Sequence, residues 1–147
     1  MMRKGKNIFI IIVISIIIFL ILCPIVNNIT VSNLIKDIEM IPLPKKTYIV
    51  EKLSQAGKLN GNGNGMQYFG AVLLNSELSL EELEQYYKPF RETPWEYVVE
   101  IQNSQEIKAI EHGHALFESD VFKDHYYIVY SWGKGISPFQ YFDLRGH

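Results

Sequence analysis

The chain has 147 residues, one cysteine and a formal net charge of −2, and this length suits one ordinary domain beside an apolar segment. Three of its 14 basic residues precede that segment, which leaves 11 basic against 16 acidic residues in the rest of the chain. An acidic domain lacks the basic face that nucleic-acid binding needs, so we expect no nucleic-acid partner. A single cysteine also excludes an intrachain disulfide.

Residues 8–26 are almost all Ile, Val, Leu and Phe. As a helix, this run spans about 28 Å, which is close to the thickness of the hydrocarbon core of a bilayer. Arg3, Lys4 and Lys6 lie before it without an acidic residue, so the positive-inside rule places residues 1–7 in the cytoplasm as a basic tail. The sequence predicts a single-pass signal-anchor helix at the cell membrane, with the C-terminal domain outside.

Two other interpretations of the apolar run remain open. A cleaved signal peptide needs small residues just before the cut, and the weak candidates Thr30 and Ser32 lie rather far beyond the run. A lipoprotein signal would place a small residue directly before Cys23, where the chain has the bulky Leu22. Both flanks favour a retained anchor.

Residues 27–44 are expected to form a stalk. Val31, Leu34, Ile35 and Ile38 follow the spacing of one helical face, and prolines end the pattern. A short helix that packs on the domain or continues the anchor explains the pattern. The alternative is an amphipathic helix on the membrane surface, which needs more basic residues than Lys36.

Residues 45–147 are expected to form the extracytoplasmic domain. Residues 47–56 and 66–75 are rich in strand-forming residues and flank a Gly-Asn segment, residues 61–65, which is typical of a hairpin loop. The second strand is more continuously apolar and is therefore expected at the centre of the sheet. Ser79 and Glu82 have the spacing of a capping box, which predicts a helix that Pro89 limits near Tyr87 or Lys88.

The second half of the domain reads as further strands. Residues 95–102 and 124–132 favour strands, residues 107–117 favour a strand with a break near Gly113, and residues 139–144 favour a last short strand. The predicted fold is α+β, with an antiparallel sheet in ββα-β-β-β order, one main helix packed on a face, and a single transmembrane helix in front.

The leading Leu43-Pro44, the strand pair, the helix that ends in Tyr86-Tyr87, and the aromatic start of the next strand at Pro94-Trp95 form one pattern. In this pattern the chain resembles small membrane-anchored extracytoplasmic proteins of low-GC Gram-positive bacteria. The resemblance covers about half of the chain. It implies a cell-surface setting and supplies no activity and no catalytic residue.

Three histidines form the only cluster with metal-ligand chemistry. His112 and His114 would share one face of a strand, and His125 would join them across a hairpin. Their spacing matches no zinc signature and no cysteine contributes, so solvated or hydrogen-bonded histidines are the alternative. No cofactor is expected from this pattern.

Aromatic residues crowd the C-terminal end of the chain. Trp132 and Tyr130, together with Asn62 and Asn64 of the Gly-Asn segment, are the candidate binding residues for an envelope protein or a glycan. The alternative is that the aromatic side chains pack in the core and that the loop only turns the hairpin.

No catalytic residue is predicted. Cys23 lies in the apolar run, and Ser131 lacks the strand-turn-helix context of a nucleophile elbow. The chain is therefore expected to be a non-enzymatic, membrane-tethered interaction or binding module. The alternative is a small metal-dependent envelope hydrolase or metal-binding protein that uses His112, His114 and His125.

Overall fold

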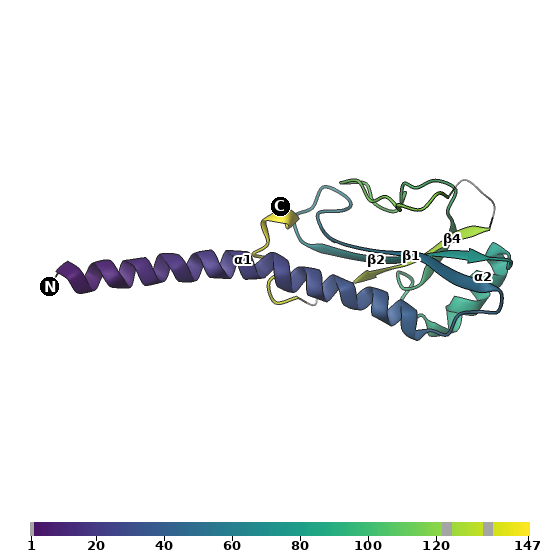
Figure 1. Ribbon diagram of the computed structural model, residues 1–147, viewed down its shortest axis with the longest axis horizontal. Helices are drawn as coiled ribbons and strands as arrows, with labels where there is room; N and C mark the ends of the chain where they lie inside the picture. The colour runs from purple at the N-terminus through teal and green to yellow at the C-terminus, as the bar shows by residue number, and fades with distance from the viewer. Residues whose placement is uncertain (1, 122–124, 134–136) are drawn as a thin grey trace.

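The computed structural model describes residues 2–121, 125–133 and 137–147, and it has an α+β architecture (Figure 1). A long N-terminal helix, α1 (Met2–Met40), precedes a four-stranded antiparallel sheet and one short helix, α2 (Leu80–Tyr87). The strands are β1 (Thr47–Gly57), β2 (Gln67–Ser76), β3 (Val98–Ile101) and β4 (Tyr126–Gly133). Short 3-10 helices, η1 (Lys88–Phe90) and η2 (Leu144–Gly146), follow α2 and β4.

The strand order is β1-β2-β4-β3, and every neighbouring pair is antiparallel. The β1–β2 hairpin runs from the pair Thr47–Ser76 to the pair Gly57–Gln67, with one irregularity in register after Ile49. The prediction that β2 is a central strand is confirmed, because it lies between β1 and β4 and is buried along almost its whole length. At one end of the strands, β1 finishes at Gly57 and β2 begins at Gln67. We call this end of the sheet the Gly57 end.

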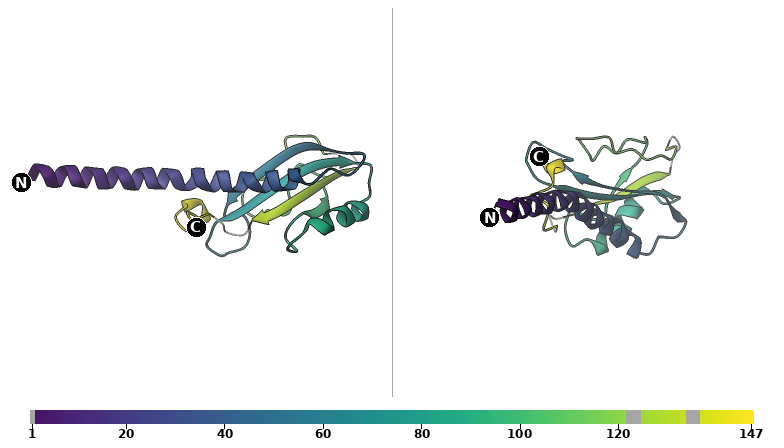
Figure 2. Two further views of the ribbon diagram at one scale, coloured as in Figure 1. Left: turned by 90° about the horizontal axis from the view of Figure 1, so that it is seen from below. Right: turned by 60° about the vertical axis from the view of Figure 1, so that its left-hand side comes forward.

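One face of the sheet is covered by helices. The C-terminal half of α1 and the helix α2 lie on this face, and Figure 2 shows both on the same side of the strands. Alternate residues of the strands point toward them, as a period of two requires. The buried residues of this layer are Ile38, Ile41, Val72, Leu74, Leu83, Tyr87, Val99, Tyr127 and Val129.

Helix α1 approaches the sheet very closely at Gly70. A Cβ atom on Gly70 would lie 2.6 Å from Cβ of Leu34, so the helix rests directly on the backbone of β2. The apolar stripe that the sequence places in residues 31–38 faces this contact, and Val31 and Ile38 are buried. Residues 27–40 of the expected stalk are thus helical, continue α1 without a break and pack on the domain, while residues 41–44 form the non-helical connection to β1.

The opposite face of the sheet is covered by irregular chain. The segment 102–121 crosses this face and buries its apolar side chains against Phe69, Ala71, Leu73, Ile128 and Tyr130. The predicted strand at residues 107–117 is wrong, because only one isolated bridge, between Glu106 and Leu116, forms there. Its buried residues are unevenly spaced along the chain and Gly113 has φ +88°, so no regular alternation is possible.

Two other strand predictions also need correction. The third strand begins at Val98 and not at Trp95, because residues 93–96 form a turn in which Glu96 N–H donates to the Thr93 carbonyl. The prediction of a last strand at residues 139–144 is wrong. Instead, two successive turns form there: Gln140 N–H donates to the Ser137 carbonyl, and Phe142 N–H donates to the Phe139 carbonyl. The 3-10 helix η2 follows these turns. The order within the domain is therefore ββαββ and not ββα-β-β-β.

The capping box of α2 is confirmed. The Ser79 hydroxyl accepts from Glu82 N–H at 3.3 Å, and the Glu82 carboxylate accepts from Ser79 N–H at 2.8 Å. Two of the helix's four initial N–H groups are thereby involved in the reciprocal pattern that this motif predicts. The α-helix ends at Tyr87, where the sequence places its limit, and Pro89 lies in the 3-10 turn that follows.

The N-terminal half of α1 projects away from the sheet as a single rod (Figure 1). Residues 5–40 are long and apolar enough to cross a membrane, with a mean hydropathy of 3.5 over the most apolar window, of which 6% is buried. A signal sequence near an N-terminus has the same properties. The helix continues through Pro24, which lies between the projecting and the packed halves.

Candidate functional site

A surface pocket with a volume of about 340 Å³ opens at the Gly57 end of the sheet. This volume lies within the range of small-ligand sites. Two tryptophans form its aromatic part: Trp95 is 65% exposed and Trp132 is half-buried. The lining residues are Asn60, Met66, Gln67, Trp95, Trp132 and Gly133.

The two indoles are positioned by the sheet and by one turn. Trp132 is at the end of β4, where its ring meets Phe69 edge-on with 4.8 Å between centroids. Its backbone N–H donates to the Trp95 carbonyl at 3.2 Å, which holds the turn at residues 93–96 against the strand. One indole is thus fixed by the core, and the other is offered to solvent beside it.

The polar side chains of the pocket are already used within the fold. Gln67 Oε1 accepts from the N–H groups of Leu59 and Asn60 at 2.8 and 2.7 Å. The Asn60 side chain accepts from Glu111 N–H at 2.8 Å and donates to the Ala109 carbonyl at 2.9 Å. The pocket therefore offers a ligand mainly aromatic and thioether surface.

A second hollow of about 140 Å³ lies on the other side of Trp132 and Gly133, and its rim is acidic. Asp37 of α1 and Glu96 contribute carboxylates to it. Burial, and next the negative charges of Asp37 and Glu96, raise the pKa of Tyr97 in this hollow. The two hollows share Trp132 and Gly133 as lining residues, and we call the two together the cleft. Its aromatic surface and the negative charge on one side favour a ligand that is partly apolar and basic.

The Gly-Asn segment borders the pocket. Asn62 and Asn64 are exposed, and the segment lies between two lining residues, Asn60 and Met66. Gly61 has φ +69°, a conformation that favours glycine, and its N–H donates to the Glu111 carboxylate at 2.9 Å. Two candidate binding residues from the sequence therefore lie beside the pocket that Trp132 lines.

Tyr130 lies apart from this site. It is 7% exposed, and its ring packs 5.3 Å from Phe69 in the core. Its hydroxyl donates to the Glu100 carboxylate at 3.0 Å. The structure thus gives Tyr130 a packing position, while Trp132, two residues later, reaches the surface.

The structure does not bring the three histidines together. His112 is near the Gly57 end: its N–H donates to Leu59, and its Nε2 donates to the Gly61 carbonyl at 2.7 Å. The carbonyl of His125 accepts from Ser76 N–H at the far end of β2, which is about 30 Å away at 3.3 Å per residue. His114 is exposed. Within the described part of the chain, no group of three or more His, Cys, Asp or Glu is arranged to hold a metal ion.

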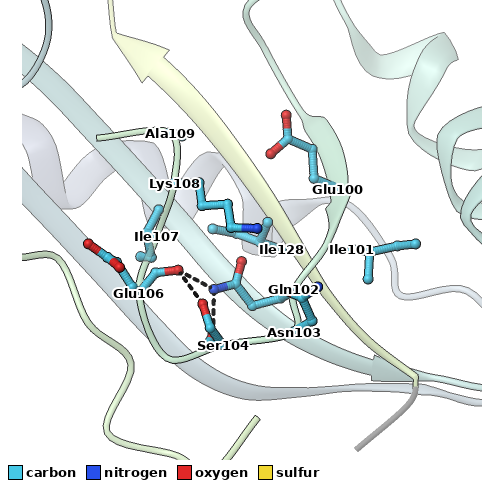
Figure 3. Close-up of a pocket in the computed structure, with 10 residues that line it drawn as sticks. All are labelled: Glu100, Ile101, Gln102, Asn103, Ser104, Glu106, Ile107, Lys108, Ala109 and Ile128. Atoms are coloured by element: carbon cyan, nitrogen blue, oxygen red, sulfur yellow. Dashed lines mark hydrogen bonds between the residues drawn. The ribbon is translucent and has the colours of Figure 1, made fainter. Parts of the chain in front are cut away.

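A small cavity lies between the end of β3 and the segment 102–121, which we call the covering segment (Figure 3). Its volume is about 20 Å³, which accommodates about one water molecule. Gln102 fills its polar side by donating to the carbonyls of Ser104 and Glu106 at 2.7 and 2.9 Å. This cavity is a packing feature of the covering segment and has no room for a ligand.

A buried polar network joins α1 to the end of the chain. Asn27 is completely buried and donates to Asp143 at 2.8 Å, while the Tyr68 hydroxyl donates to Asn27 Oδ1 at 2.9 Å. The Arg145 guanidinium donates to both oxygens of Asp143 and also to Asn28 and the Pro24 carbonyl. The hydrogen bond from Arg145 lowers the pKa of Asp143 to about 2.

Sequence reasoning found only part of these features. It singled out Trp132 but interpreted Trp95 only as the aromatic start of a strand, although both tryptophans of the chain stand beside a turn-forming Pro or Gly. It treated Asn27 only as the first residue of the stalk. A polar residue at helical spacing from a packing stripe was the available sign that this side chain is also buried.

No protein-family model matches this sequence, and the searches of curated proteins and of solved structures likewise found no match. The resemblance to membrane-anchored proteins of low-GC Gram-positive bacteria therefore stays a prediction. The functional argument depends on the site itself.

Proposed function

We propose that this protein is a non-enzymatic binding module, tethered to the cell membrane by α1, whose Trp95–Trp132 pocket holds a basic, partly apolar segment of an extracytoplasmic protein. The main support for this proposal is the pocket itself, because one exposed and one half-buried indole line a hollow of about 340 Å³. Tryptophan is over-represented among the residues that dominate binding energy at interfaces.

The packing of α1 supports a retained anchor. The helix continues from the apolar run into the half that packs on the sheet. Cleavage near Thr30 would remove Asn27 and leave its partners Tyr68 and Asp143 without this hydrogen bond. A lipoprotein would begin at Cys23, whose side chain is completely buried. Each of these processing events would disrupt a packed part of the fold.

The charges in front of the apolar run support the orientation. Arg3, Lys4 and Lys6 precede it, and basic residues beside a spanning helix remain in the cytoplasm. The sheet and both hollows around Trp132 then lie outside the membrane. A partner must consequently be reached in the extracytoplasmic space.

The chemistry of the cleft supports binding and the class of partner. The lining side chains are aromatic, thioether or amide on one side of Trp132, and the amides are engaged within the fold. The carboxylates of Asp37 and Glu96 on the other side attract a positive charge. Lysine or arginine beside an apolar residue satisfies both sides, because a cation also binds an indole face.

Photo-crosslinking of the full chain in cells tests this proposal. A p-benzoylphenylalanine at exposed Asn64 lies beside the pocket, and one at Tyr48, which is 58% exposed near the other end of β1, is the matched control. We expect the Asn64 position to give a protein adduct that the Tyr48 position does not give.

Pocket variants decide whether the adduct depends on the cleft. Trp95→Ala and Asp37→Asn should each reduce the adduct from the Asn64 position several-fold, while Tyr48→Ala should leave it unchanged. Adduct formation that survives both pocket variants would contradict the proposed site. An adduct that resists protease but is removed by a muramidase would identify a glycan and exclude the protein partner.

A further inference from the structure

The end of the chain packs on the apolar run of α1. The ring of Phe19 meets those of Phe139 and Phe142 edge-on, with 5.6 and 5.2 Å between centroids. Figures 1 and 2 show the C-terminal end of the chain beside the middle of α1, where the helix leaves the sheet. We call residues 137–147 the C-terminal segment.

The position of Phe19 fixes the depth of this contact. Phe19 lies within the apolar run, seven residues before its end at Val26, which is about 10 Å along a helix axis. The part from Ile8 to Phe19 covers only about 17 Å, so it is too short to span the hydrocarbon core alone. If α1 crosses the membrane, Phe19 is inside it, and the rings that touch Phe19 are at the same depth.

The C-terminal segment carries an exposed apolar surface at this level. Tyr141 is 71% exposed, Phe142 is 53% exposed and Leu144 is 77% exposed. The adjoining turns of α1 also carry exposed apolar side chains, because Leu22 and Ile25 are 44% and 48% exposed. Isolated exposed apolar residues are common, but a group of large ones that adjoins a spanning helix matches the aromatic belt at a membrane interface.

The segment is held firmly against the fold. Lys58 N–H donates to the Arg145 carbonyl at 2.9 Å, and Gly65 N–H donates to the Gly146 carbonyl at 2.6 Å. A Cβ atom on Gly146 would lie 2.8 Å from the backbone nitrogen of Met66, so the segment is in direct contact with the hairpin. Its position relative to α1 is therefore set by the structure.

Several of its polar groups are also paired within the fold, which suits an apolar surrounding. The amides of Gln140 and Phe142 donate within two turns, and the amide of Gly146 donates to the Asp143 carbonyl. Asp143 is 2% exposed and is paired with Arg145. Backbone groups that are satisfied internally are what lipid contact requires.

We propose that the C-terminal segment is a second membrane contact, which inserts Tyr141, Phe142 and Leu144 into the outer leaflet beside α1. This inference rests on the anchor in the proposed function. An insertion of about 10 Å agrees with the depth that interfacial elements reach. The Arg145 side chain, 39% exposed beside the Pro24 carbonyl, lies at the end of the apolar run, where it faces lipid phosphates. The bilayer thereby fixes the height and tilt of the Trp95–Trp132 pocket.

Spin-label accessibility in the full chain tests the contact. The protein, with Cys23→Ala, is reconstituted in phosphatidylcholine vesicles and labelled with a nitroxide at Leu144→Cys. Ile17→Cys on the apolar run and Tyr48→Cys on β1 are the controls, with 50% and 58% exposed parent side chains. Collision with oxygen, which enriches in lipid, is compared with collision with a water-soluble nickel complex.

We expect the label at Leu144 to collide with oxygen several-fold more than with nickel, as at Ile17, and the label at Tyr48 to show the reverse. Tyr141→Cys is a second position for the same readout. A water-exposed label at both positions, with a lipid-exposed label at Ile17, would overturn the second contact and leave the anchor intact. A water-exposed label at Ile17 as well would overturn the anchor and this inference together.

Discussion

The side-chain amide of Asn27 donates a hydrogen bond of 2.8 Å to the carboxylate of Asp143, which follows it by 116 positions in the chain. The Tyr68 hydroxyl donates to the same amide at 2.9 Å. One buried side chain therefore connects α1, the central strand β2 and the C-terminal segment. Since both partners are also removed from solvent, the loss of Asn27 would leave two polar groups without this partner.

Replacement of Asn27 with leucine keeps a similar volume and removes both hydrogen bonds. We expect the free energy of unfolding to fall by about 3 kcal/mol, because an unsatisfied buried polar group costs about 1–3 kcal/mol. Denaturant unfolding of the full chain in detergent micelles measures this loss. Asn33→Leu is the matched control on the same helix, because Asn33 is exposed and its bond with Lys36 is at the surface. Equal effects of the two substitutions would contradict the structural role of Asn27.

The Asp143 carboxylate should make stability depend on acidity. Its pKa falls from the ordinary value of 3.8 to about 2 in the fold, chiefly because Arg145 donates to it. A lowered pKa contributes stability that is present above about pH 4 and is lost as the pH falls toward about 2. We expect the wild-type chain to lose about 2 kcal/mol more than Asp143→Asn over this window. Parallel pH profiles of the two proteins, measured by denaturant unfolding, would show that the carboxylate has no such effect.

The contact between α1 and β2 is sensitive to one methyl group. A Cβ on Gly70 would lie 2.6 Å from Cβ of Leu34 and 3.3 Å from the Ile35 nitrogen, so the helix must move away from the sheet. We expect Gly70→Ala to lower the free energy of unfolding by about 1–3 kcal/mol, the usual cost of overpacking. Gly63→Ala is the control, because no atom lies within 4 Å of its added Cβ. A Gly70→Ala protein that melts like the Gly63→Ala protein would contradict this close approach.

Much of the fold could be predicted because its signals are local. The hairpin strands, the capping box at Ser79 and the strand that leads to Trp132 each depend on residues within one element. The segment 102–121 could not be predicted in this way. Its apolar residues have neither a helical nor a strand period, and they are buried because they cover a face of the sheet that the helices leave open.

The site was less predictable than the fold because its parts are distant in sequence. Trp95 and Trp132 line the same pocket because the turn at residues 93–96 is hydrogen-bonded to the end of β4. Tyr130 and Trp132 are two residues apart in β4 and therefore point to the same face of the sheet. The sequence alone could not show that Tyr130 is buried in the core while Trp132 reaches the surface. Asn27 and Asp143 belong to no common sequence motif. Because they are 116 positions apart, their hydrogen bond can be recognised only in the three-dimensional structure.

Zinc tests the histidine hypothesis separately. We expect the thermal midpoint of the full chain in micelles to remain unchanged on addition of zinc, because His112 and His125 are at opposite ends of β2. Specific binding at a hundredfold excess over Kd would raise stability by about 2.7 kcal/mol. The histidine hypothesis would be supported if the midpoint rises with zinc and reverts with a chelator. The protein with both His112→Ala and His114→Ala should then show no response to zinc. The reference for this comparison is the same double variant without zinc, since His112 also donates to the Gly61 carbonyl beside the pocket.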